Sequence, residues 1–89
     1  MARISLTPHL AQVAPREPGA FAGETAGAAI EALCAAYPAL KSYIADEQGR
    51  LRKHIALFID GEHLHGEEAL ARRVEHGTHI YIFQALSGG

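Results

Sequence analysis

The chain has 89 residues, with 8 basic and 10 acidic side chains and a formal net charge of −2. This length allows one compact domain with a modest hydrophobic core and leaves no room for a second. Neither sign of charge is gathered into a block that could follow a phosphate backbone, which argues against a nucleic-acid partner.

The cysteine content and the hydropathy limit which bonds and metal sites the chain can form and where in the cell it is expected. Cys34 is the single cysteine, so the chain cannot form an internal disulfide or a metal or iron–sulfur site built from two or four cysteines. No apolar run approaches the roughly 20 residues that cross a bilayer, and the first residues lack the pattern of a signal peptide. We therefore expect a soluble, cytoplasmic protein with no membrane partner.

The first part of the chain predicts a strand followed by a loop. In residues 2–10, Ile4 and Leu6 alternate with polar side chains until a proline interrupts the pattern, as in a half-buried strand. Residues 11–24 are rich in proline and glycine, which predicts a loop with a short second strand near residues 20–22.

A helix is predicted from Thr25, a suitable N-cap, to Tyr37. The segment is rich in alanine, and Ile30, Leu33 and Tyr37 recur at helical spacing. Pro38 then ends the helix.

A second, shorter helical segment is predicted around Leu40, Tyr43 and Ile44, which would share one side of a helix. Residues 46–49 then have the composition of a turn.

The strongest strand pattern covers residues 51–59, and Asp60-Gly61 after it is a hairpin turn signal. Alternation would give one face Ile55, Leu57 and Ile59, and the other His54, Ala56, Phe58 and Asp60.

The remainder predicts two more strands. Residues 62–75 are polar and should hold one short strand and a turn, with Leu64, Leu70 and Val74 as apolar anchors. Residues 79–86 form the last predicted strand. Its side chains would alternate between one face with Ile80 and Ile82 and another with Tyr81, Phe83 and Ala85.

This order of elements predicts an α+β domain in which one main helix packs on a mixed sheet of four to five strands. One helix covers only one sheet face. The covered strand residues would be Ile4, Leu6, Ile55, Leu57, Ile59, Ile80 and Ile82, facing Ile30, Leu33 and Tyr37 of the helix. Nothing in the sequence supplies a cover for the other face.

Four segments carry a resemblance to a known family: AAYPAL at residues 35–40, GRLRKHI at 49–55, LFIDGE at 57–62 and ALSGG at 85–89. They resemble the ubiquitin-like sulfur carriers, which include the molybdopterin synthase small subunit, the thiamin sulfur carrier and the cysteine-synthesis carrier. The resemblance implies a β-grasp domain over residues 1–86 and a flexible tail over residues 87–89. The length and residues 38–52 favour the molybdopterin or cysteine-synthesis type.

The resemblance also implies the chemistry of the C-terminus. An E1-like enzyme would adenylate Gly89 with ATP, and sulfur from a donor would convert the product to a thiocarboxylate, which then supplies a sulfur-accepting biosynthetic enzyme. Ser87 and Gly88 would thread the tail into the partner, because glycine lacks Cβ and adopts torsions closed to other residues. The chain itself would bind no cofactor and would not be an enzyme.

Two other functions remain open at this stage. The activated Gly89 could be attacked by a lysine amine, which would make the chain a protein modifier. Alternatively, the chain could be a non-covalent β-grasp interaction module in which the terminal glycines are incidental. An independent enzyme is least favoured, because no nucleophile–base pair, phosphate loop or pair of carboxylates stands at motif spacing.

The partner-docking face is predicted from the strand alternation. Phe58, Tyr81 and Phe83 fall opposite the predicted core, and with Leu86 they would form an exposed apolar surface for the partner enzymes. The one basic cluster, at residues 50–53, is interpreted as a solvated strand edge more readily than as a docking site.

The remaining chemistry-bearing residues are interpreted as structural. Cys34 lies in an alanine-rich helix without a neighbouring base, which predicts a small buried core residue. No metal site is predicted, because no acidic or cysteine ligand is spaced to complete a set with the histidines, although His63 and His65 would share a strand face.

Overall fold

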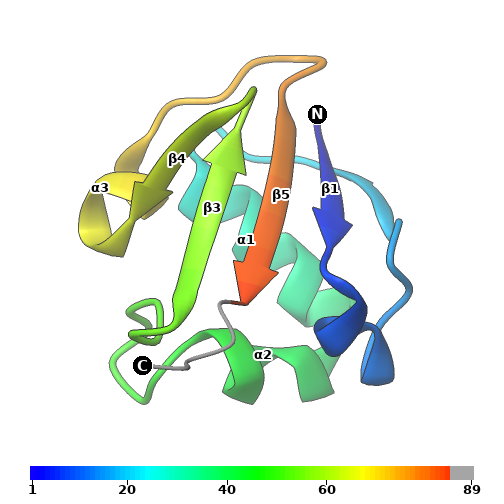
Figure 1. Ribbon diagram of the computed structural model, residues 1–89. Helices are drawn as coiled ribbons and strands as arrows, with labels where there is room; N and C mark the ends of the chain where they lie inside the picture. Colours follow the sequence, from blue (N-terminus) through cyan, green and yellow to red (C-terminus); the bar gives the residue numbers. More distant parts are fainter. Residues whose placement is uncertain (85–89) are drawn as a thin grey trace.

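The computed structural model describes residues 1–84. A five-stranded mixed sheet in the order β2-β1-β5-β3-β4 packs on one face against helix α1 (Figure 1). The strands are β1 (Ala2–Leu6), β2 (Gly19–Phe21), β3 (Ile55–Ile59), β4 (Glu62–His65) and β5 (His79–Gln84), and the helices are η1 (Pro8–Gln12), α1 (Ala26–Ala36), α2 (Pro38–Ile44) and α3 (Gly66–Ala71). The predicted β-grasp architecture is confirmed.

Strand β5 occupies the centre of the sheet. It runs parallel to β1, with Ile4 opposite Ile80, and antiparallel to β3, with Leu57 opposite Ile82. The remaining pairs, β1 with β2 and β3 with β4, are antiparallel. The last strand therefore joins two pairs of strands that have no ladder to each other.

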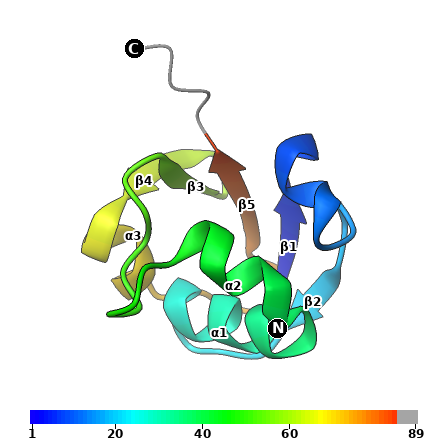
Figure 2. The same cartoon turned by 90° about the horizontal axis from the view of Figure 1, so that it is seen from below.

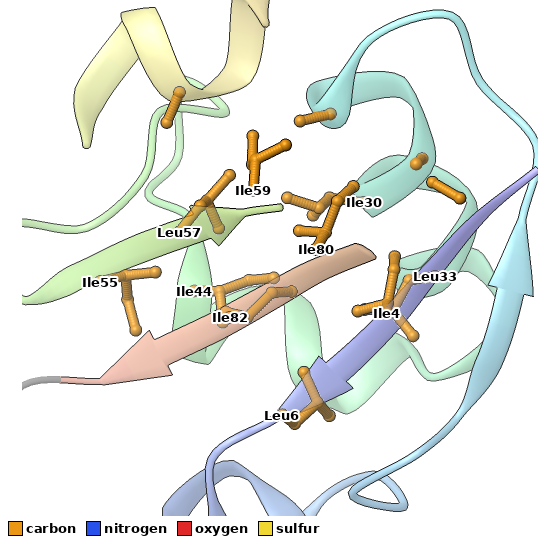
Figure 3. Packing of buried hydrophobic residues seen from close by; sticks show 14 of the residues in the cluster. Ile4, Leu6, Ile30, Leu33, Ile44, Ile55, Leu57, Ile59, Ile80 and Ile82 are labelled. Carbon is orange, nitrogen blue, oxygen red and sulfur yellow. The ribbon is translucent and has the colours of Figure 1, made fainter. Parts of the chain in front are cut away.

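One face of the sheet forms the core with α1 and α2, which lie on the same side of it (Figure 2). Every strand residue predicted for this face is at most 4% exposed, and Leu33, Leu40 and Ile44 of the helices are fully buried (Figure 3). Strict alternation produces this separation, because successive strand side chains point to opposite faces. Tyr37 packs against the same cluster but is only partly buried.

Helix α1 begins and ends where its sequence predicts. The Thr25 hydroxyl oxygen accepts a hydrogen bond from the Ala28 N–H at 3.1 Å, which satisfies one of the unpaired donors of the first turn. The Tyr37 N–H donates to the Leu33 carbonyl at 2.9 Å, and Pro38 then starts α2 in a new direction.

The prediction that Leu40, Tyr43 and Ile44 share one side of the short helix was wrong for Tyr43. Leu40 and Ile44, four positions apart, are buried, whereas Tyr43 is 42% exposed. With only two turns in α2, the i, i+4 pair defines the stripe that reaches the core, and Tyr43 falls beside it.

The long strand predicted from residue 51 begins instead at Ile55. Leu51 forms an isolated bridge with Ala45, and the Ile55 N–H donates to the Arg52 carbonyl at 2.9 Å. Residues 52–54 are therefore a turn, and the prediction that placed His54 on a strand face was wrong. The turn prediction at residues 46–49 is confirmed, because the Gly49 N–H donates to the Asp46 carbonyl at 3.0 Å.

The polar segment after the hairpin contains a helix, α3, where the sequence predicted a turn. Leu64 and Val74 are buried as predicted, but Ala69 is fully buried while Leu70 is only partly so. Helix α3 has only six residues and buries one of them, Ala69. The small side chain of alanine lets the helix backbone lie close to the core. Within residues 1–84, no helix is long and apolar enough to cross a membrane.

Candidate functional site

The path of the chain toward its C-terminus is set by β5. Gln84, its last residue, lies opposite Ile55 at the start of β3. The predicted site residues Leu86, Ser87, Gly88 and Gly89, and the predicted domain boundary at residue 86, lie outside the described residues. The part of the site that the structure describes is therefore the surface of the sheet around β5.

The open face of the sheet carries an aromatic patch, defined here as Phe58, Tyr81 and Phe83. The Phe58 ring meets Phe83 edge-on, with centroids 5.8 Å apart, and lies 6.4 Å from Tyr81. All three rings are half-buried, because they shield one another while no helix covers them. Their predicted place on the open face is confirmed, and their role in docking stays a prediction.

Two histidines extend the patch onto β4. The His63 ring stacks on Phe58 with centroids 5.0 Å apart, and His65 lies 6.2 Å from His63 on the same strand face, as predicted. No group of three or more potential metal ligands occurs in residues 1–84. The stacked geometry assigns His63 to the aromatic surface.

A polar cluster that sequence reasoning missed borders the patch on its other side. The buried Ser5 hydroxyl donates to Glu17 Oε1 at 3.0 Å and lies 2.8 Å from His79 Nε2. A hydroxyl group can donate to a carboxylate and at the same time accept from an imidazole N–H. A hydrolytic triad needs the histidine between serine and acid. Here the serine is in the middle, so the cluster fixes the Glu17 loop on the sheet.

Cys34 lies on the opposite side of the molecule, in an open groove of about 710 Å³ that Lys41, Ile44 and Leu51 also line. Burial raises the pKa of the Cys34 thiol, which the positive charge of Lys41 partly opposes. The residue packs on the core but is only partly buried, which corrects the prediction of a small buried core residue.

The comparisons with known proteins agree with this geometry. The model of the ThiS family matches residues 12–89. The chain belongs to the ThiS family. It is thus a member of the ubiquitin-like sulfur carriers, small proteins that act as carriers or modifiers and are not themselves enzymes.

Among its relatives, small archaeal modifier protein 1 of Haloferax volcanii is 35% identical over 65 residues, which cover 73% of this chain and 70% of that protein. The crystal structure of SAMP1 from the same organism superposes with a TM-score of 0.84 at 32% identity and covers 99% of this chain and 98% of the other. The Amycolatopsis orientalis BexX/CysO complex contains a chain with a TM-score of 0.80 and 19% identity, with full coverage of both chains at 100%. At that identity the last likeness shows the fold alone.

Proposed function

We propose that this protein is a sulfur carrier that is activated at the carboxylate of Gly89. The observation that carries the proposal is the family match, which runs through the Gly88-Gly89 ending. The position of β5 supports it, because a central strand with partners on both sides anchors the segment that leads to that ending.

The chemistry requires activation, because a terminal carboxylate has a pKa near 3.5 and is an anion at neutral pH. One carboxylate oxygen attacks the α-phosphate of ATP and releases pyrophosphate. A hydrosulfide then adds to the acyl carbon, AMP leaves with the C–O electron pair, and a thiocarboxylate remains. ATP and the sulfur donor belong to the partner enzyme, and the carrier contributes a narrow ending in which Ser87 and Gly88 precede the reacting group.

Two partners follow from this function: an E1-like adenylating enzyme and a sulfur-accepting biosynthetic enzyme of the molybdopterin or cysteine-synthesis type. The aromatic patch, continued by Leu86 in the sequence, is the surface that we assign to docking. Aromatic side chains at partly exposed sites contribute strongly to protein interfaces.

The second candidate function is protein modification, in which a lysine amine attacks the activated Gly89 and forms an isopeptide. The name of the Haloferax relative, a modifier protein at 35% identity, favours keeping this candidate. Both functions share the adenylation step and differ in the nucleophile that follows.

The test is incubation of the protein with its E1-like enzyme, ATP and sulfide, with two readouts: ATP–pyrophosphate exchange and intact mass. We expect exchange, and a mass gain equal to the replacement of one oxygen by sulfur. Deletion of Gly89 is the matched control, because it shortens the reach by about 3.4 Å and should abolish both readouts. Exchange by the truncated chain refutes the proposal, and attachment to lysines without any thiocarboxylate favours the modifier.

A further inference from the structure

The basic cluster of Arg50, Arg52 and Lys53 lies at the end of the sheet where β5 ends. Arg52 and Lys53 belong to the turn that leads into β3, and the first residue of β3, Ile55, is opposite Gln84. Figure 1 shows this loop, in green, at the same end of the sheet as the arrowhead of β5. The prediction of a solvated strand edge is therefore replaced by a turn beside the exit of the chain.

The charges in this turn are not equally compensated. Arg50 pairs with Asp46 at 3.4 Å, and the Arg50 and Gln48 N–H groups both donate to the same carboxylate. These bonds lower the pKa of Asp46, with the Arg50 N–H as the largest cause. Asp46 is thus already occupied, and it is not available to neutralise the residues that follow.

Arg52 and Lys53 are exposed and have no carboxylate partner among residues 1–84. Arg52 Nε donates to the Ser42 carbonyl at 2.8 Å, which holds the side chain against α2. The loop also carries Glu47, so its uncompensated charges are two positive and one negative.

The opposite end of the sheet has a different arrangement. There Arg72 forms a two-pronged contact with Glu62, with both N–O distances at 3.0 Å, and Arg73 lies 4.0 Å from Glu24. In a chain of net charge −2, the exit end therefore presents unpaired positive charge where the far end presents arginines with acidic partners.

We propose that Arg52 and Lys53 form a basic docking rim that receives an acidic surface of the enzyme that activates Gly89. The inference rests on the proposed function and names the chemistry of the partner. The rim and the aromatic patch are linked through β3, which begins two residues after Lys53 and carries Phe58. Charges at the rim of an interface accelerate association and fix orientation, and they do so through the electrostatic field around the exit.

The experiment is ATP–pyrophosphate exchange by the E1-like enzyme, measured against carrier concentration at low and high salt. The variants are Lys53→Glu, the graded Lys53→Gln, and Arg73→Glu as a matched control with the same charge change at the far end. Lys53 is exposed and forms no salt bridge within residues 1–84, so its variants should keep the fold, which thermal unfolding verifies.

We expect Lys53→Glu to raise the half-saturating concentration of carrier about 10-fold at ~50 mM salt and less than about 2-fold at ~500 mM, because salt screens exposed charges. Lys53→Gln should lie between, and Arg73→Glu should stay near wild type. If Lys53→Glu and Arg73→Glu behave alike while wild type is activated, the rim is refuted and the carrier function stands. If wild type is not activated, the proposed function itself fails.

Discussion

Two adjacent residues of β5 should give opposite results when each is replaced by alanine. Ile82 is fully buried against the helices, whereas Phe83 is half-buried on the open face. Ile82→Ala removes buried carbon and leaves a cavity, which costs about 3 kcal/mol of unfolding free energy. Phe83→Ala removes a ring that is only half-buried, together with its edge contact with Phe58 at 5.8 Å, which costs about 1 kcal/mol.

For a domain of this size, 1 kcal/mol corresponds to a shift of roughly 4–8 °C in the thermal midpoint. Ile82→Ala should therefore melt about 12–24 °C below wild type, and Phe83→Ala only about 4–8 °C below. Urea unfolding at fixed temperature provides the free energies directly.

The effects of the two variants on activation should have the opposite order to their effects on stability. At a temperature where both are folded, Phe83→Ala should raise the half-saturating carrier concentration in pyrophosphate exchange by at least about 10-fold, since a docking aromatic contributes 1.4 kcal/mol or more. Ile82→Ala should change it less than about 2-fold. Greater destabilisation by Phe83→Ala than by Ile82→Ala would show that the faces are reversed. Unchanged half-saturation in Phe83→Ala would remove the patch from the docking surface.

Three further predictions concern single groups. Burial raises the pKa of the Cys34 thiol, so iodoacetamide should alkylate it more slowly in the folded than in the urea-unfolded protein near neutral pH, and Cys34→Ala should still accept sulfur; equal rates would contradict the burial. The Arg72 hydrogen bond lowers the pKa of Glu62 below its ordinary 4.5, so its stabilisation is complete above that pH and is lost as pH falls through the lowered value. In Glu62→Gln, the unfolding free energy measured with urea should therefore fall less steeply as the pH is lowered. An unchanged pH dependence would show that the Glu62–Arg72 pair does not contribute to it. Gly61 has φ +87°, so Gly61→Ala should cost about 1 kcal/mol in thermal unfolding, and no loss would mean that the turn relaxes.

The sequence predicted the core well because its signal is local. The alternation at Ile55, Leu57 and Ile59, and at Ile80 and Ile82, indicates a half-buried strand without any knowledge of which strands lie beside it. The same reasoning failed at residues 52–54, where the predicted strand was extended back to residue 51 across three consecutive polar residues, whereas the Ile55 N–H donates to the Arg52 carbonyl and closes a turn.

The candidate site was predictable in part. The two-residue turn at Asp60-Gly61 fixes the hairpin register, which places His63 opposite Phe58, so the stacked pair could have been derived from the sequence. The contact of Ser5 with His79 and Glu17 could not. It depends on the parallel pairing of β1 with β5 and on the return of the intervening loop, neither of which has a local signal.

The strand order also determines when the sheet can form during translation. Since β1 pairs only with β2 and β5, and β3 only with β4 and β5, the described chain without β5 is two separate two-stranded ribbons, which are marginal in water. The ribosome makes β5 after every other described element, and folding must wait for this distant segment to close. A translation product that stops short of residue 79 therefore has no assembled sheet and no aromatic patch. Synthesis of β5 therefore completes the sheet and the aromatic patch in the same step.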